Sequence, residues 1–292
     1  MPVTEILILR HGHRVQWSLN PATGVYSTTH PYPTGLPADP PLALSGVAQS
    51  KEVGLFLGDY LAEHAKQDRL RIYSSPFYRC LETLGPTVEA LIETTPGNPA
   101  PKKSVQVRAE RGIGEWFGKA WFVQPKPEEL TRLREDFFPW LDGTYESKMA
   151  PPAHGETIVS LHDRVAQALA MVIEDVDKEY SQAGRGDEGV TLLLCVHAAT
   201  IIATGRALTG QLPNDYNNDE FKCYTCGLSK FVRKGTPPLK DSYYHDEWKS
   251  QGIAGGWECS LNSDCGYLSQ GEENGWRFNG DEAFDSYQPP PN

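Results

Sequence analysis

The sequence has 292 residues, a net charge of −11 at pH 7 and a mean hydropathy of −0.47. This acidic balance argues against direct nucleic-acid binding, because the phosphate backbone attracts a basic face. No apolar run reaches the ~20 residues of a membrane span, and the first residues lack the basic and apolar regions of a signal peptide. We therefore expect a nuclear or cytoplasmic protein with one large core, neither membrane-bound nor secreted.

Strand and helix patterns alternate along the chain. Short apolar runs predict strands at 6–9, 71–74, 105–107, 190–196 and 228–232. Helical spacing and flanking residues predict helices at 45–64, 78–93, 127–136, 156–179 and 199–208. Ser45 and Thr157 are placed to cap the first and the fourth of these helices. The alternation predicts an α/β fold, a three-layer α/β/α sandwich with a mostly parallel central sheet.

The first predicted strand ends in the motif Arg10-His11-Gly12-His13-Arg14. Open α/β sheets present ligand-binding residues at the carboxyl ends of their strands, and a glycine lets the backbone turn sharply there. Arginines bind phosphoryl oxygens, and their charge disfavours protonation of the His11 ring, which keeps a lone pair for attack. The motif favours a phosphohistidine mechanism over a strand that merely ends in solvated residues.

Two later segments supply further candidates for the same site. Arg79 falls in the first turn of a predicted helix, where backbone N–H groups favour an anion. His197 directly follows the predicted strand 190–196 and precedes another helix. Alone, Arg79 is typical of a surface arginine and His197 of a structural histidine. Because two histidines lie at strand ends and an arginine starts a helix, the joint pattern predicts one phosphate-binding crevice.

In order and spacing, these motifs resemble the histidine phosphatase superfamily, also called phosphoglycerate-mutase-like, from about residue 5 to about residue 210. The resemblance implies that His11 is the nucleophile. It also implies that Arg10, Arg79 and His197 form the phosphate pocket, with Arg14 as a further arginine beside them. No metal ion or cofactor is expected.

The resemblance also implies a proton donor in the loop 110–118. Its first glutamate, Glu110, matches the position that usually holds the acid, so we expect Glu110 to protonate the leaving oxygen. Glu115 lies in the same loop and is the second candidate. Either glutamate is alternatively a solvated loop residue.

The sequence departs from parts of the family pattern. Ala198 and Ala199 follow the late histidine where many members have glycine, and the acid loop and lid of the mutases are missing. The chain most resembles a fungal subgroup that includes the histidine phosphatase domain of the tau 55-kDa subunit of transcription factor TFIIIC. This implies a metal-independent phosphatase for phosphomonoesters, including phosphotyrosine or other protein phosphoesters. The alternative is a weakly active or inactive assembly module of the RNA polymerase III machinery, which binds phosphorylated partners and other TFIIIC subunits.

The expected domain organisation has three parts. Residues 1–234 form the histidine phosphatase domain, in which the long loop 15–41 lies near the site and contributes aromatic residues to a substrate wall or to packing. Residues 235–280 are an extension rich in aromatic and acidic residues that packs on the same domain, and 281–292 are a flexible tail.

Cys223 and Cys226 have the C-x-x-C spacing of half a zinc site. Because a structural zinc site needs a second such pair or suitably spaced histidines, reduced thiols are the simpler interpretation.

Overall fold

A six-stranded sheet forms the centre of the computed structural model, which describes residues 2–95, 103–235 and 248–284. The strand order is β5 (Val107–Ala109), β4 (Leu70–Ser74), β7 (Val190–Val196), β1 (Val3–Arg10), β8 (Leu228–Arg233) and β9 (Trp257–Asp264). The first four run parallel, whereas β8 is antiparallel to β1 and β9 is antiparallel to β8. The predicted mostly parallel α/β fold is confirmed.

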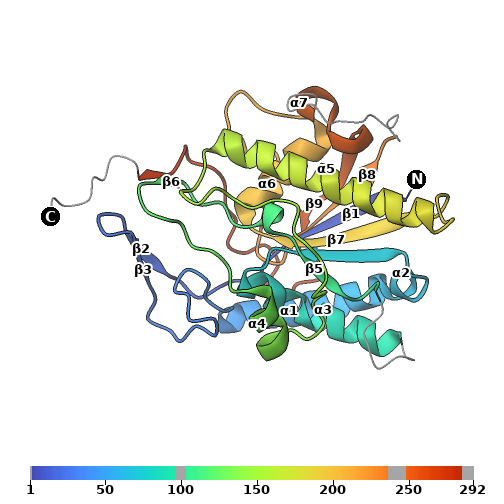
Figure 1. Ribbon diagram of the computed structural model, residues 1–292, viewed down its shortest axis with the longest axis horizontal. Helices are drawn as coiled ribbons and strands as arrows, with labels where there is room; N and C mark the ends of the chain where they lie inside the picture. Colours follow the sequence, from blue (N-terminus) through green and yellow to red (C-terminus); the bar gives the residue numbers. More distant parts are fainter. Residues whose placement is uncertain (1, 96–102, 236–247, 285–292) are drawn as a thin grey trace.

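Two buried cores lie on opposite faces of the sheet, because successive strand residues point to opposite sides. Ile6 and Ile8 of β1 belong to the core beneath α5 (Ile158–Gln182) and α6 (Ala198–Thr209). Leu7 and Leu9 belong to the core formed with α1 (Leu44–Tyr60) and α3 (Tyr78–Thr94). Figure 1 shows these two helix layers above and below the sheet.

The helix boundaries correct several sequence predictions. The helix expected at 45–64 consists of α1 and a separate α2 (Ala62–Lys66). The helix expected at 127–136 is a short α4 (Leu130–Arg132) that continues as a π-helical turn. Thr157 caps α5 as predicted, since its side chain accepts a hydrogen bond from the Ser160 N–H. The prediction for Ser45 is wrong, because Ala43 is the N-cap residue and the Ser45 hydroxyl bonds to the His13 ring instead.

The residues after 234 contribute to the sheets. Strand β9 forms the outer edge of the central sheet, and β10 (Ala283–Phe284) pairs with β6 (Lys119–Ala120) near the site. Helix α7 (Trp248–Gln251) packs against α6. Within the loop 15–41, β2 (Ser18–Asn20) and β3 (Val25–Ser27) form a hairpin. Of the expected extension and tail, residues 236–247 and 285–292 lie outside the described residues.

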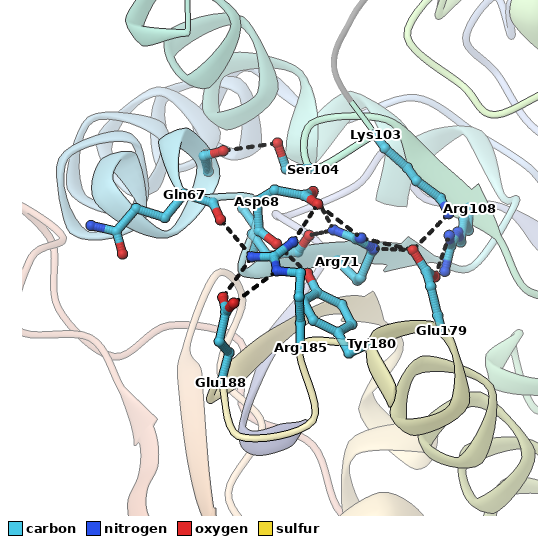
Figure 2. Close-up of polar contacts among 12 residues, drawn as sticks. Gln67, Asp68, Arg71, Lys103, Ser104, Arg108, Glu179, Tyr180, Arg185 and Glu188 are labelled. Atoms are coloured by element: carbon cyan, nitrogen blue, oxygen red, sulfur yellow. Dashed lines mark hydrogen bonds and ion pairs between the residues drawn. The ribbon is translucent and has the colours of Figure 1, made fainter. Parts of the chain in front are cut away.

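An ionic network fastens the sheet to the carboxyl end of α5, at the start of the parallel strands (Figure 2). Arg71 of β4 donates to both Glu179 of α5 and Asp68. Arg185 bridges Asp68 to Glu188, and so ties in the turn before β7. This network therefore fixes the amino-terminal ends of the parallel strands, and the carboxyl ends of the same strands face the site.

None of the helices among the described residues has the length and apolar character needed to cross a membrane.

Candidate active site

His11 directly follows β1 and is 3% exposed. Its backbone N–H donates to the Val196 carbonyl of β7, which places it beside the end of the neighbouring strand. Its ring Nδ1 lies 2.8 Å from the Gly12 carbonyl oxygen. A carbonyl only accepts hydrogen bonds, so Nδ1 carries the proton and Nε2 keeps its lone pair.

The surroundings keep the His11 ring neutral. Burial, followed by the charges of Arg79, His197 and Arg10, holds its pKa well below the ordinary value of 6.5. The ring therefore has an unprotonated nitrogen at neutral pH, which is the form that a nucleophile needs. This agrees with the argument from the charges of the sequence motif.

Gly12 is required by close packing rather than by an unusual backbone angle. A Cβ at this position would lie 2.9 Å from the Gly46 carbonyl oxygen at the start of α1. The Gly12 N–H donates to the Thr83 hydroxyl of α3. The turn after β1 is therefore held between two helices, and this fixes the direction of the His11 ring.

His197 directly follows β7 and is the N-cap residue of α6, fully buried. The His11 and His197 rings meet edge to face with centroids 5.2 Å apart. Nε2 of His197 lies 2.7 Å from the Ser75 hydroxyl, and Nδ1 lies 3.1 Å from Oε2 of Glu115. Burial lowers the pKa of His197, but Cys80 and Glu115 outweigh it, so the pKa is raised above 6.5. The pKa values of the two rings thus shift in opposite directions: the neutral form of His11 is favoured, whereas the protonated form of His197 is stabilised relative to a free imidazole.

Three arginines surround the two rings. Arg79, in the first turn of α3, is fully buried and pairs with Asp39 at 3.3 Å and Glu115 at 2.8 Å. Nη1 of Arg10 donates to the carbonyls of Cys223 and Asn274, at 2.6 and 2.5 Å. Arg14 lies over the Trp17 ring, 5.1 Å from its centroid, and burial lowers its pKa to about 10.

Two of these guanidinium groups retain buried donors. Nε of Arg10 and Nε of Arg79 have no hydrogen-bond partner among the described residues. A buried N–H without a partner costs free energy that a bound anion can recover. The local charge therefore suits a phosphate group, even though the whole chain is acidic.

The two candidate glutamates occupy different places. Glu110 is fully buried, and its carboxylate accepts hydrogen bonds from the backbone of Gly112 and Lys148 and from the hydroxyls of Tyr145 and Ser147. No contact within the described residues joins it to either imidazole. Glu115 instead bonds to Arg79 and His197. The geometry thus places Glu115 beside the two imidazoles. It does not support the expectation from the sequence that Glu110 is the proton donor.

Charge also decides the state of Glu115. Burial alone would raise the pKa of its carboxyl, but His197, Arg79 and His11 hold this pKa well below the ordinary value of 4.5. The carboxylate is therefore ionised before substrate binds. A phosphate dianion placed among the same cations would raise this pKa, because negative charge disfavours ionisation of a nearby carboxyl.

Three neighbouring residues were absent from the predicted site. Asp39 orients Arg79 and accepts hydrogen bonds from the Tyr78 N–H, while burial raises its pKa to about 7. Ser75 fixes Nε2 of His197, and Sγ of Cys80 lies 3.6 Å from the same nitrogen. Ser75 and Cys80 flank Arg79 in sequence, so the strand–turn–helix motif was a signal for both. No equivalent signal pointed to Asp39, which lies in the long loop.

His11, Glu115 and His197 are also the donor types of a metal site, with one ligand atom of each within 4.8 Å of the others. The surrounding guanidinium groups of Arg10, Arg79 and Arg14 make this position unfavourable for a divalent cation. The donor atoms of Glu115 and His197 also already bond to their neighbours. The charge around the cluster favours an anion.

Comparison with known proteins agrees with this geometry. The family model for the histidine phosphatase superfamily (branch 1) matches residues 6–243. The chain belongs to this superfamily. Among curated proteins, it is 30% identical over 293 residues to the transcription factor tau 55 kDa subunit of Saccharomyces cerevisiae, with 95% of this chain and 59% of the yeast protein covered. It is 27% identical over 243 residues to the ecdysteroid-phosphate phosphatase of Drosophila melanogaster, with 73% of this chain and 28% of that protein covered.

Similarity to solved structures confirms the fold. The ecdysone phosphate phosphatase from Bombix mori, in complex with tungstate, has a TM-score of 0.53 at 20% identity, covering 84% of this chain and 98% of that chain. Mycobacterial hydrolase 2 has a TM-score of 0.51 at 17% identity, covering 90% and 91% of the two chains. The chain spans only 59% and 28% of the lengths of the two curated relatives above.

Proposed function

We propose that this histidine phosphatase superfamily member hydrolyses phosphomonoesters without a metal ion. The observation that carries the proposal is the neutral His11, whose Nδ1 is fixed by the Gly12 carbonyl while Nε2 retains its lone pair beside Arg10, Arg79 and His197. An anion site that holds a neutral imidazole has the parts needed to bind a phosphoryl group and attack it.

In the first step, Nε2 of His11 attacks phosphorus, and a P–N bond forms as the P–O bond to the alcohol breaks. The leaving oxygen takes a proton from Glu115, which is protonated once the substrate's negative charge has raised its pKa. In the second step, water attacks phospho-His11, Glu115 accepts a proton from that water, and inorganic phosphate and neutral His11 result. Arg10, Arg79 and the His197 imidazolium stabilise the equatorial oxygens in both steps.

The natural substrate class includes phosphotyrosine or other protein phosphoesters. The neighbouring loop supports a substrate with a ring, since Trp17, Tyr26 and Phe117 form an aromatic cluster near Arg14. The Drosophila relative is named for a phosphatase activity on an organic phosphate, which supports the reaction class for this chain.

Turnover of para-nitrophenyl phosphate and a phosphotyrosine peptide, measured with EDTA, tests the proposal. The native chain and His13→Ala should be active, whereas His11→Ala should not. His13 is the matched control, because it lies in the same motif and its ring bonds to the exposed Ser45. Loss of activity in EDTA, or equal activity in His11→Ala, would sink the proposal.

A second candidate function is assembly within a TFIIIC-like complex of the RNA polymerase III machinery in the nucleus. Similarity to the yeast tau 55 kDa subunit over 95% of this chain favours it. In this alternative, the pocket binds a phosphorylated partner without turnover. Co-purification with TFIIIC subunits, combined with vanadate binding and no hydrolysis by the native chain, would support this function over catalysis.

A further inference from the structure

A pocket adjoins the candidate phosphate site and shares Glu115 with it. It has a volume of about 500 Å³, part of which is open to solvent. Four segments form its walls: the turn after β4, the loop after Glu110, the loop after β6, and the loop before α5. The lining consists of Pro76, Phe77, Arg111, Gly114, Glu115, Phe117, Gln124, Pro125, Lys126, Pro127, Pro151, Pro152, Ala153 and Gly155.

The walls are apolar and held in place. Five prolines and two phenylalanines supply most of the side chains. Proline fixes its own φ angle, so little conformational entropy is lost when a ligand contacts it. Gln124 donates to the Gly118 carbonyl and accepts from the Tyr26 hydroxyl. Backbone hydrogen bonds from Ala120 to His154 and from Gln124 to Ala153 join the two facing loops. Such a rigid apolar surface suits a planar ring.

Two cations interrupt this apolar lining. Within the described residues, neither the Arg111 guanidinium nor the Lys126 ammonium forms an ion pair. Acidic side chains are in excess in this chain, whose net charge is −11, so the two cations stay unpaired despite an abundance of acidic residues. The only acidic side chain in the lining is Glu115, whose carboxylate is already bonded to Arg79 and His197. The two cations are therefore free to pair with a negative group of a bound molecule.

We propose that this pocket holds the alcohol portion of the substrate, and that this portion is an aromatic group bearing a carboxylate. The inference rests on the proposed phosphatase function. With the phosphate between His11 and Arg79, the leaving oxygen lies toward Glu115 and the ring lies against Phe77, Phe117 and the prolines. The carboxylate pairs with Arg111 and Lys126. Either a small aromatic acid or an acidic phosphotyrosine peptide has this chemistry.

A matched substrate pair tests the charge preference. 3-(4-phosphonooxyphenyl)propanoate and its propanamide have similar phenol leaving groups and differ in the distal charge. We expect kcat/KM for the carboxylate to exceed that for the amide by about tenfold at low salt, equivalent to about 1.4 kcal/mol. In the double variant Arg111→Gln, Lys126→Gln, this ratio should fall to about 1 because the electrostatic attraction is lost.

The controls separate the pocket from the catalytic proposal. Lys119→Gln removes an exposed cation in the same region that does not line the pocket, so the ratio should stay near its native value. A thermal melt of each variant checks folding. A ratio near 1 in the native chain, or an unchanged ratio in the folded double variant, overturns the pocket assignment while phosphatase turnover persists. No turnover of either substrate or of para-nitrophenyl phosphate overturns both proposals.

A peptide pair distinguishes the two sources of this chemistry. Phosphotyrosine peptides with aspartate or asparagine next to the phosphotyrosine are compared in the same assay. A preference for the aspartate peptide that disappears in the double variant supports the pocket and identifies a protein substrate. A preference confined to the small acid supports the pocket and identifies a small-molecule substrate.

Discussion

Oε2 of Glu115 lies 3.1 Å from Nδ1 of His197. This pair connects the loop after β5 to the end of β7, and Arg79 bonds to the same carboxylate from α3. Three segments far apart in the sequence therefore determine the charge of one carboxyl group. That convergence assigns Glu115, rather than Glu110, the proposed role of proton donor.

Exchanging the two glutamates for glutamine should separate catalysis from stability. Glu115→Gln should slow hydrolysis of an alkyl phosphate by about 10²–10⁴-fold, because the alkoxide then leaves without a positioned acid. The loss on para-nitrophenyl phosphate should be much smaller, since nitrophenolate leaves readily. Measurements of kcat/KM on both substrates check this, and equal losses on the two would contradict the acid role.

Glu110→Gln is the matched control in the same loop. It should lower the free energy of unfolding by about 1–3 kcal/mol, because the amide replaces one oxygen that accepts buried hydrogen bonds. Its loss of alkyl phosphate turnover should be much smaller than that of Glu115→Gln. The reverse order would return the donor role to Glu110.

The sequence predicts the position of a site residue best where that residue directly follows a strand of the central sheet. His11 and His197 directly follow parallel neighbours β1 and β7, so strand order alone brought them together. Glu110 and Glu115 are separated by a 3-10 turn that Glu110 itself caps. The direction of the chain after such a turn depends on tertiary packing, and a motif match could not distinguish the two carboxyls.

Strand β9 was missed for a different reason. Its burial alternates irregularly, with Trp257 buried and Glu258 exposed, and Ser260, Leu261 and Asn262 all exposed. Central parallel strands are covered on both faces and are recognisable as continuous apolar runs, whereas an edge strand is not. Only its pairing with β8 identifies this segment as part of the sheet.

Arg79→Lys should reduce kcat/KM for phosphomonoesters by about 10²–10³-fold. Lysine cannot reproduce the planar guanidinium that contacts Asp39, Glu115 and the phosphate region together. Steady-state kinetics and vanadate inhibition measure the effect. Arg132→Lys is the control, because Arg132 is half exposed and pairs with Glu128 and Asp136 away from the imidazoles. Similar kinetics in the two variants would argue against a specific phosphate contact.

Cys80→Ser should move the alkaline limb of the pH–rate profile to lower pH. The thiol of Cys80 has its pKa lowered to about 5, despite the opposing effect of burial, by Cys195 and His197. Its negative charge helps to raise the pKa of His197. Activity that needs the imidazolium is present below this raised pKa and is lost as the pH rises through it, so removing the thiolate brings the loss to lower pH.

A pH profile of kcat/KM between about pH 5.5 and 9 measures the shift, expected to be on the order of one pH unit. Cys195→Ser is the control, because the pKa of Cys195 is raised by burial and its thiol stays neutral. Serine retains a donor toward Cys80 at that position. An alkaline limb that stays in place in Cys80→Ser would show that the thiol does not set the charge of His197.

Glu179→Gln should lower the free energy of unfolding at neutral pH, and this difference from the native chain should disappear in acid. Burial opposes ionisation, but Arg71 and Lys103 lower the pKa of Glu179 from 4.5 to about 2 (Figure 2). Because the folded pKa lies below the unfolded value, the carboxylate contributes stability above pH 4.5, and this contribution is lost as the pH falls toward 2. The native chain should exceed Glu179→Gln by about 1–3 kcal/mol in free energy of unfolding at pH 7.

Urea unfolding at pH 7, 5 and 3 measures the free energy of unfolding of the native chain and of the variant. The difference between the two should become smaller as the pH falls. Glu174→Gln, on the same helix, removes a solvent-exposed pair with Lys178 and should have no measurable effect at any of these pH values. A pH-independent difference for Glu179→Gln would mean that its side chain stabilises α5 by packing. In that case, the ion pairs with Arg71 and Lys103 would not be what holds this end of the sheet.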